Sequence, residues 1–312
     1  MRVAVFGSGA VGGYFGARLL RAGVEVCLMA RGEHLRAIQE KGLRVSGASG
    51  EFTVQPSLAT DQPAAVGEVD LVLVGVKAWQ VEEAAQAMRL LIGKNTVVLP
   101  LQNGVEAPFQ LANALGKEVV LGGLCQISTF ILAPGMIYHV GIDPTIIFGE
   151  LDRRLSPRTM EIQALFERAG VRAVIAEDIG VALWDKFLFI AAFGALGAVS
   201  RSTAGEILQV APTRRLLEEV MLEIWKVARA AGVLLPAEAI GRRLRFIEQM
   251  PPQTVASLAR DLGEGRPSEL DQLIGAVVRL GERYEVEVPL SRALYAALLP
   301  LEWRARRKII PA

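Results

Sequence analysis

The chain has very few of the residues that build disulfide frameworks and metal sites. It contains two cysteines and two histidines in 312 residues. Cys27 and Cys125 both lie in apolar, strand-like runs, so we interpret them as buried thiols. His34 and His139 have no ligand-like spacing with them. The sequence therefore predicts neither a disulfide scaffold nor a metal site.

Asparagine and lysine are also scarce. Asparagine occurs only at positions 95, 103 and 113, and seven of the 34 basic residues are lysines. A GC-rich genome would produce both biases, and a hot habitat would also disfavour asparagine. A lysine or asparagine in an unusual setting is therefore less often a casual choice in this chain.

Charge and hydropathy exclude several classes of partner. The net charge of +1 points to neither nucleic acid nor an acidic membrane. Arg304, Arg306, Arg307 and Lys308 form a small basic cluster, which is most simply a solvated helix end. The N-terminus lacks a targeting signal, and no apolar run looks long and helical enough to span a bilayer. We expect a cytoplasmic protein that binds neither membranes nor nucleic acid.

The N-terminal segment has the strongest pattern in the sequence. An apolar strand, Arg2–Phe6, leads directly into the glycine-rich run Gly7-Ser8-Gly9-Ala10-Val11-Gly12. Helical spacing follows to Arg21, and Val24–Met29 is a second strand. Strand, G-x-G-x-x-G, helix and strand in this order are typical of a dinucleotide-binding βαβ unit, whose helix N-terminus faces the phosphates. The alternative is a plain structural turn.

The end of the second strand bears on the choice of cofactor. An acidic residue there usually binds the ribose 2′-hydroxyl of NAD, but this chain has Met29-Ala30-Arg31. A guanidinium suits the 2′-phosphate of NADP, which favours NADP over NAD. Arg31 could also be a solvated loop arginine, and Glu33 lies close enough to weaken the inference.

The pattern of the chain changes near residue 176. Before it, strands alternate with helices, which predicts a mostly parallel sheet wrapped on both faces. Beyond the first βαβ unit, the expected strands are Gly42–Val45 and Glu51–Val54 as a hairpin, then Val69–Val74, Thr96–Leu99, Val119–Thr129, Met136–Val140 and Thr145–Phe148. Helices are expected at Val181–Leu196, Thr213–Ala231, Pro236–Ile247, Gln253–Leu262, Ser268–Tyr284 and Leu290–Arg304. We therefore expect an α/β domain at 1–176 and an all-helical domain at 177–312.

Two polar residues in the helical half could carry chemistry. Lys186 lies in the apolar run Trp184–Phe193, where desolvation would lower the pKa of its ammonium toward the range useful for proton transfer. The alternative is a lysine whose stem is buried and whose head reaches water. Glu269 follows Ser268 at an expected helix start, where a carboxylate is also favourable simply as a partner of the helix dipole.

Taken in order, several segments resemble the ketopantoate reductase (2-dehydropantoate 2-reductase) family over nearly the whole chain. They are Gly7–Gly12, Lys77-Ala78-Trp79-Gln80, Leu101-Gln102-Asn103-Gly104, Trp184-Asp185-Lys186, and Ser257 to Asp271 with Asp261 and Glu269. The resemblance implies NADPH, a Rossmann-type N-terminal domain and an all-α C-terminal domain. It implies that Lys186 is the general acid and that Glu269 binds and orients the substrate. It also implies that Lys77, Gln80 and Asn103 line the cofactor and substrate site, and that Ser257 holds the substrate carboxylate.

The sequence departs from this family at two positions. Members often carry asparagine four and eight residues after the lysine, whereas this chain has Ile190 and Gly194. The leading hypothesis is NADPH-dependent reduction of 2-dehydropantoate, in pantothenate biosynthesis. The same fold could instead reduce another 2-oxo acid or an imine, or be a catalytically silent NADP-binding regulator. The apolar helical half suggests a homodimer.

Overall fold

The computed structural model describes residues 1–307 and contains two compact units. The first unit consists of Met1–Gln102 and Ala107–Ile179. The second consists of Asn103–Glu106 together with the chain from Gly180 onward. The segment Asn103–Glu106 therefore belongs to the second unit although it follows a strand of the first.

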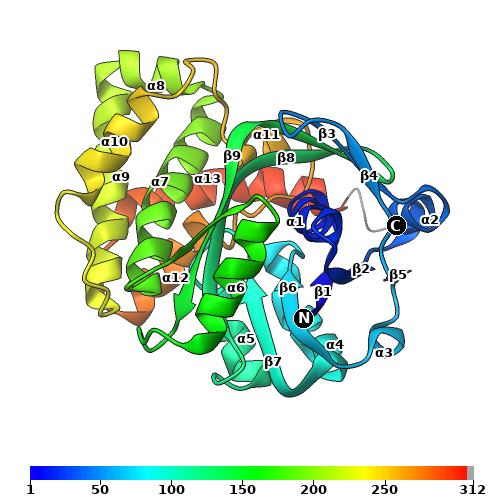
Figure 1. Ribbon diagram of the computed structural model, residues 1–312. Helices are drawn as coiled ribbons and strands as arrows, with labels where there is room; N and C mark the ends of the chain where they lie inside the picture. The colour runs from blue at the N-terminus through cyan, green and yellow to red at the C-terminus, as the bar shows by residue number, and fades with distance from the viewer. Residues whose placement is uncertain (308–312) are drawn as a thin grey trace. The chain divides into compact units, whose positions relative to one another are not determined.

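A five-stranded parallel sheet runs through the first unit (Figure 1). Its strand order is β5-β2-β1-β6-β7, with β1 at Arg2–Phe6, β2 at Glu25–Met29, β5 at Leu58–Thr60, β6 at Val69–Val74 and β7 at Ile92–Pro100. The sequence predicts four of these strands, but β5 has only three residues and shows no apolar period. The Rossmann-type arrangement expected for this part of the chain is confirmed.

Helices connect the strands of this sheet and cover its faces. They are α1 at Ala10–Arg21, α2 at Gly32–Lys41, α3 at Pro63–Val66, the 3-10 turns η1 at Ala78–Gln80 and η2 at Arg89–Leu91, α4 at Val81–Met88 and α5 at Ala107–Leu115. Successive strand residues point to opposite faces. Val3 and Val5 accordingly share a core with Phe15 of α1, whereas Ala4 and Phe6 share another with residues of α4 and α5.

The first unit also contains a second, mixed sheet, whereas the sequence suggests a single sheet. Its order is β10-β9-β3-β4, with β8 paired antiparallel to β9. The strands are β3 at Leu43–Gly47, β4 at Phe52–Val54, β8 at Leu121–Ala133, β9 at Met136–Glu150 and β10 at Arg172–Ile175. The predicted β3–β4 hairpin is confirmed. Residues of this sheet, including Leu43 and Phe148, join the α1 side of the core.

Strand β9 also corrects a boundary. The sequence suggests two strands, Met136–Val140 and Thr145–Phe148, because Gly141, Asp143 and Pro144 look like a turn. In the structure the strand continues through them. Its pairing with β8 shifts register there, from Gln126 opposite Thr145 to Ser128 opposite Val140. A bulged ladder accommodates the proline and glycine that would break a regular one.

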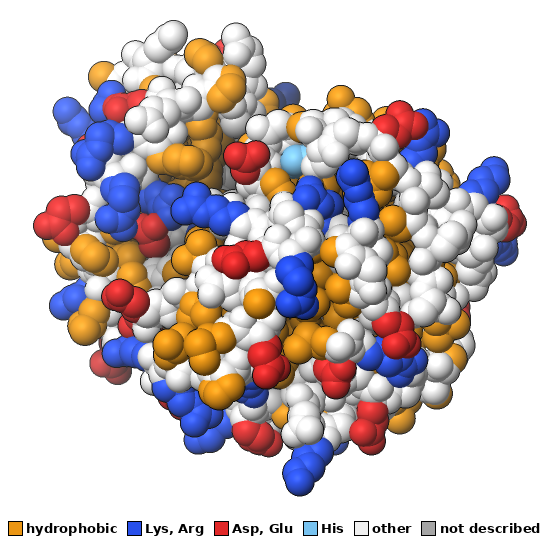
Figure 2. Space-filling view, in the orientation of Figure 1, with side chains coloured by type: hydrophobic (Ala, Val, Ile, Leu, Met, Phe, Trp, Pro, Cys, Tyr) orange, Lys and Arg blue, Asp and Glu red, His pale blue; other side chains and the backbone are white. Residues whose placement is uncertain are grey.

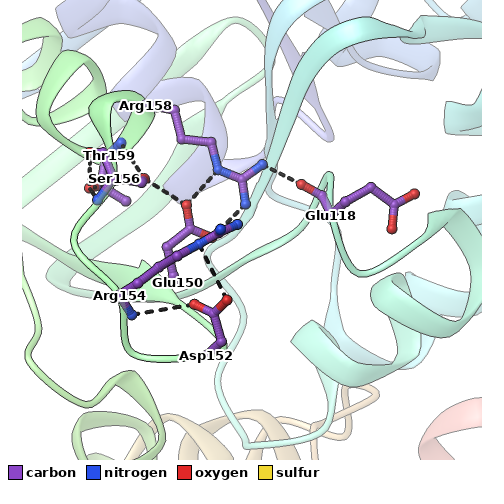
Figure 3. Close-up of polar contacts among 7 residues, drawn as sticks. All are labelled: Glu118, Glu150, Asp152, Arg154, Ser156, Arg158 and Thr159. Carbon is purple, nitrogen blue, oxygen red and sulfur yellow. Dashed lines mark hydrogen bonds and ion pairs between the residues drawn. The ribbon is translucent and has the colours of Figure 1, made fainter.

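A buried ion pair fastens helix α6 (Pro157–Arg168) to the end of β9 (Figure 3). The carboxylate of Glu150, which is 4% exposed, accepts hydrogen bonds from Nε and Nη2 of Arg158 at 2.6 and 2.5 Å. Ser156, the N-cap residue of α6, donates to the same carboxylate at 2.6 Å. Burial raises the pKa of Glu150, but these hydrogen bonds and the charge of Arg158 outweigh it, and the pKa lies below its usual value.

The second unit is all helical, as the sequence predicts. Its helices are α7 at Ile179–Ser200, α8 at Ala204–Gln209, α9 at Ala211–Ala230, α10 at Ala239–Glu248, α11 at Ser257–Gly263, α12 at Ile274–Arg283 and α13 at Pro289–Arg307. Helix α8 is not among the predicted helices, although Thr203 and Glu206 are typical of a helix N-terminus. They form a reciprocal capping box, in which the Glu206 carboxylate accepts the Thr203 N–H at 2.8 Å.

Helix α7 contradicts the expectation that no helix is long and apolar enough to span a membrane. Its 22 residues meet both criteria by length and composition alone. However, 61% of its most apolar window is buried inside the structure, and Phe187, Leu188 and Ala191 have no exposed surface. A core helix of a helical bundle has the same apolar character on all sides. A cytoplasmic location stays a prediction.

Charged side chains of both signs are interspersed on the face shown in Figure 2. This distribution agrees with the net charge of +1. The basic cluster expected at the C-terminal end of the last helix is only partly visible, because Lys308 lies outside the described residues.

Candidate active site

The turn from β1 into α1 has a backbone that requires glycine at two positions. Gly7 has a φ of +97°, and a Cβ there would lie 2.6 Å from the backbone nitrogen of Val76. A Cβ at Gly12 would lie 2.3 Å from the carbonyl oxygen of Gly7. At Gly9, by contrast, an added Cβ meets no atom within 4 Å. Gly7 and Gly12 therefore shape the loop, and the backbone at Gly9 faces open space.

Hydrogen bonds hold this loop to the neighbouring strand ends. The Ser8 N–H donates to the carbonyl of Met29, the last residue of β2, at 2.7 Å. The Gly75 N–H, just after β6, donates to the carbonyl of Phe6 at 2.8 Å. The carboxyl ends of β1, β2 and β6 are thus joined at one edge of the parallel sheet, where ligands of such sheets bind.

Gln102 connects the carboxyl end of β7 to the same edge of the sheet. It lies two residues after β7, is 6% exposed, and donates from Nε2 to the carbonyls of Val74 and Val76 at 2.8 and 2.9 Å. Its Oε1 has no hydrogen-bond partner within residues 1–307. Gln102 therefore holds the loop that packs against Gly7. No pattern in the sequence distinguishes Gln102, although it adjoins the Asn-Gly pair.

Arg31 comes two residues after β2, and β2 pairs with β1, the strand that leads into the Gly7–Gly12 loop. It is exposed, follows β2 and is the N-cap residue of α2. The Glu33 carboxylate, which could have competed for its charge, forms an ion pair with Arg36 at 2.6 Å. In the structure, Glu33 therefore pairs with Arg36, and a phosphate-binding role for Arg31 stays a prediction.

Lys77 and Gln80 occupy the turn after β6. Lys77 is exposed, and its N–H donates to Oε1 of Gln80 at 3.3 Å. The Lys77 ammonium lies 5.7 Å from the ring centroid of Trp79, a cation–π distance. Gln80 thus shapes the turn that presents Lys77. Both residues lie on the same sheet edge as the glycine-rich loop.

Three residues predicted to act on the substrate form one hydrogen-bonded chain within the second unit. Lys186 donates from Nζ to Oδ1 of Asn103 at 2.9 Å. Asn103 donates from Nδ2 to Oε2 of Glu269 at 3.0 Å. The amide places its oxygen toward the ammonium and its nitrogen toward the carboxylate, so both contacts agree with its polarity. All three side chains are partly buried.

Gly104 explains why an Asn-Gly pair occurs here. Its φ is +100°, and a Cβ would lie 3.0 Å from the carbonyl oxygen of Gln272. A larger residue would be strained and would crowd the turn that carries Glu269. Gly104 therefore allows the Asn103 segment to lie against this turn.

The turn that carries Glu269 is not the helix start that the sequence suggests. Helix α12 begins at Ile274, five residues later than Glu269. Ser268 is not the N-cap residue of this helix: its hydroxyl accepts the Leu270 N–H at 3.3 Å within the preceding turn. Its N–H donates to both carboxylate oxygens of Glu302 at 3.2 and 3.0 Å, and its hydroxyl donates there too. Glu302, on α13, is 3% exposed and forms an ion pair with Arg306 at 2.7 Å. Arg306 is thus part of this network rather than of a purely solvated helix end.

A second contact holds the same turn from α13. The hydroxyl of Tyr295 donates to Oδ1 of Asp271. Burial and this hydrogen bond raise the pKa of Tyr295 to about 12, so the phenol keeps its proton at neutral pH. Glu269 is therefore flanked on both sides by residues anchored to one long helix.

Ser257 and the apolar positions of α7 also belong to the second unit. Ser257 is the exposed first residue of α11, and no described contact brings it to Lys186. Asp261 on the same helix forms an ion pair with Arg266 at 2.6 Å. Gly194 packs against Leu258, which a Cβ at Gly194 would approach to 3.3 Å. One turn nearer to Lys186, Ile190 is partly buried.

The cysteines are both buried and free. Within residues 1–307, no group of three or more His, Cys, Asp or Glu side chains is arranged to hold a metal ion.

Comparisons with known proteins cover almost the whole chain. A family model described as ketopantoate reductase PanE/ApbA matches residues 3–153, and its C-terminal counterpart matches residues 178–302. A 2-dehydropantoate 2-reductase from Halobacterium salinarum is 32% identical over 94% of this chain and 96% of its own. A crystal structure of a PanE/ApbA family ketopantoate reductase from Ralstonia eutropha is 35% identical, with a TM-score of 0.90 over 98% of this chain and 100% of that one.

The chain belongs to the ketopantoate reductase PanE/ApbA family. It is accordingly an oxidoreductase. A D-mandelate dehydrogenase solved with NADH and anilino(oxo)acetate also has a TM-score of 0.89 over 98% of this chain and 99% of its own, but at 23% identity it shares the fold alone.

Sequence reasoning missed the residues that support the site. Gln102, Glu302 and Tyr295 bind no predicted ligand, but they hold the segments that carry Lys77, Asn103 and Glu269. No local signal identifies Glu302, because an acidic residue near a basic helix end usually lies in solvent. Its role depends on Ser268, which lies 34 residues away along the chain.

Proposed function

We propose that this protein reduces a 2-oxo acid with NADPH, and that 2-dehydropantoate is its substrate and pantoate its product. Family membership and relatives named 2-dehydropantoate 2-reductase support this proposal. The observation that carries it is the chain from Lys186 through Asn103 to Glu269. An ammonium and a carboxylate held by one amide are suited to binding a polar carbonyl substrate and to moving a proton.

The residues of the first unit fit a dinucleotide. Gly7–Gly12, with the open backbone at Gly9, would bind the diphosphate, and Arg31 would bind the 2′-phosphate that distinguishes NADPH. Lys77 and Gln80 would complete this part of the site. When bound, the reduced nicotinamide supplies the hydride for C2 of the substrate.

Lys186 provides the acid in this proposal. Reduction of a ketone builds negative charge on its oxygen, and an ammonium stabilises that charge and then transfers a proton to it. The Asn103 amide oxygen accepts from Nζ and restricts where the ammonium points. Glu269 orients the amide from its other end and contacts the substrate. Ser257 and Lys77 would add hydrogen bonds to the substrate.

The assembly and domain roles belong to the same proposal. Residues 1–176 would bind NADP, and residues 177–312 would bind the substrate and form a homodimer. Light scattering after size-exclusion chromatography tests the dimer.

A second candidate keeps the reaction and changes the substrate. The α7 face that continues from Lys186 carries Ile190 and then Gly194, which packs on Leu258. Gly194 is buried, and Ile190 offers no hydrogen bond to a substrate hydroxyl. A different 2-oxo acid, or an imine, with an apolar substituent would suit the Ile190 side chain.

One assay separates these candidates. The purified protein is mixed with NADPH and, in parallel, with 2-dehydropantoate, 2-oxoisovalerate, phenylglyoxylate or a cyclic imine, and loss of NADPH absorbance is followed. The highest kcat/KM with 2-dehydropantoate supports the first candidate. A preference for one of the others supports the second, and no turnover with any of them overturns both.

A further inference from the structure

One of the two histidines connects the glycine-rich loop to a distant turn. His34, in the first turn of α2, lies with Nε2 3.0 Å from the carbonyl oxygen of Ser8. Its Nδ1 accepts a hydrogen bond from the Gly135 N–H at 3.0 Å. Gly135 lies between β8 and β9, and the Arg44 N–H donates to its carbonyl at 2.9 Å. The ring is therefore held between the loop and a well-anchored turn.

The two partners determine the state of the imidazole. A backbone N–H can only donate, so Nδ1 carries no proton, and a carbonyl can only accept, so Nε2 carries one. The ring is thus the neutral Nε2–H tautomer. A doubly protonated ring would place an N–H against the Gly135 N–H and lose that contact.

The surroundings also favour the neutral ring. Burial lowers the pKa of His34, and the hydrogen bond to Ser8 only partly opposes it. Gly7–Gly12 and Ala133–Met136, the segments it contacts, contain no titratable side chain. On its own helix, Glu33 and Arg36 form an ion pair with each other, and Arg31 is exposed.

The contact to Ser8 sets the direction of the next N–H. The peptide between Ser8 and Gly9 is planar and trans, so its C=O and N–H point in opposite directions. Ser8 is 1% exposed, and its own N–H is already bound to Met29. Holding the Ser8 carbonyl on His34 therefore turns the Gly9 N–H away from His34. Gly9 is the position where an added Cβ meets no atom within 4 Å.

We infer that His34 is a positioning residue for the cofactor: it orients the Ser8–Gly9 peptide so that the Gly9 N–H donates to the diphosphate of the dinucleotide. The inference rests on the proposed use of NADPH. His34 touches no part of the cofactor in this scheme and acts through the backbone of the loop.

Three variants test this role. His34→Ala removes both hydrogen bonds. His34→Gln keeps a donor and an acceptor at a similar separation, but it cannot be protonated. Gln39→Ala is the matched control, because Gln39 on the same helix donates to the Ala59 carbonyl at 2.9 Å, away from the loop.

The main readout is the Kd for NADPH, measured by fluorescence titration at pH 7.5, with kcat measured at saturating NADPH. We expect His34→Ala to raise the Kd about tenfold, the size of one lost hydrogen bond, with kcat within about twofold. His34→Gln should restore most of the affinity, and Gln39→Ala should leave it unchanged. A purely structural role would lower the melting temperature of His34→Ala without changing its Kd.

The pH dependence provides a second test that does not need the alanine variant to fold. The affinity of the parent protein should decrease more steeply than that of His34→Gln as the pH falls from 7.5 through the lowered pKa of His34, because only the parent can protonate the ring. The 2′-phosphate titrates near pH 6 in both, so the difference between them is the measurement.

The outcomes separate this inference from the proposed function. If the parent protein binds neither NADPH nor NADH, the proposed function fails and the inference fails with it. If the parent binds NADPH but His34→Ala binds it equally well, only the role of His34 is overturned. Equal pH profiles of the parent and His34→Gln overturn it as well.

Discussion

Replacing Lys186 tests the central chemical claim. Lys186→Ala removes the Nζ that lies 2.9 Å from Asn103 Oδ1, but it leaves the 3.0 Å contact between Asn103 and Glu269 in place. No residue of the glycine-rich loop is altered. The expected effect is therefore on the chemical step and not on NADPH binding.

The magnitude follows from the role assigned to the ammonium. A positioned general acid contributes about 10²–10⁴-fold, or about 2.7–5.4 kcal/mol of transition-state stabilisation. We expect Lys186→Ala to lower kcat by that factor while the Kd for NADPH stays within about twofold. Lys186→Arg should recover little of the loss, because a guanidinium keeps the charge but does not readily release a proton.

Asn103 is expected to act largely through this lysine. Asn103→Ala breaks both hydrogen bonds of the chain, and a charge-assisted hydrogen bond of about 1.5–3 kcal/mol corresponds to about 10- to 150-fold in kcat/KM. In the double variant with Lys186→Ala, most of this effect should disappear, because the group that Asn103 orients is already gone. Losses that multiply would show that the two residues act independently.

Steady-state kinetics with 2-dehydropantoate, and with the best alternative substrate, measures these effects. A folded Lys186→Ala variant with nearly unchanged kcat would refute the proposal and reduce Lys186 to a structural residue, worth about 0.5 kcal/mol or less. A Lys186→Arg variant with full activity would refute proton donation and leave only the role of the charge.

Three further predictions concern other parts of the molecule. Arg31→Ala should weaken NADPH binding far more than NADH binding in parallel titrations; equal affinities of the parent for both cofactors would contradict this. Arg158→Ala should lower the free energy of unfolding in urea by about 3–5 kcal/mol, because it leaves the Glu150 carboxylate buried without its partner. Since the folded-state pKa of Glu150 lies below its ordinary 4.5, the parent should hold this contribution above that pH and lose it as the pH falls through the lowered value, whereas Arg158→Ala should show a flatter acid profile. Tyr295→Phe removes the hydrogen bond to Asp271 and should lower kcat/KM with the Kd for NADPH unchanged; unaltered kinetics would mean that this bond does not position the turn.

Local patterns predicted most of the elements because each of those elements has a local cause. The strands β1, β2 and β6, and the Thr96–Leu99 part of β7, are short apolar runs, and the glycine-rich loop is a continuous motif. The second sheet has no such local cause. β3 pairs in parallel with β9, about ninety residues later, and that pairing decides which sheet a strand joins. Local patterns in one sequence do not show which distant strands pair with each other.

The start of α12 shows the same limit at one residue. Ser268 followed by Glu269 has the composition of a helix N-terminus, and propensity favours that interpretation. Glu302, on α13, accepts hydrogen bonds from the Ser268 N–H and hydroxyl, and that hydroxyl accepts only the Leu270 N–H of the turn, at 3.3 Å. The helix then begins at Ile274, and Glu269 is left on a turn. A tertiary contact thus overrides a local preference at the position where the proposed chemistry needs a carboxylate.

Two of the three hydrogen-bonded residues, Asn103 and Lys186, are unusual in the composition of the chain, which drew attention to them in addition to their motifs. Asn103 and Lys186 belong to residue types that this chain rarely uses, and the structure joins them directly. Rarity cannot show which unit a residue serves, however. Asn103 lies three residues after the last strand of the parallel sheet, so the sequence suggests that it belongs with the cofactor loop. The structure groups it with the helical unit instead, and its amide contacts an ammonium and a carboxylate that both come from that unit. Two neighbouring residues therefore have different roles. Gln102 hydrogen-bonds to the sheet edge that would bind the dinucleotide. Asn103 orients the groups that would bind and protonate the substrate.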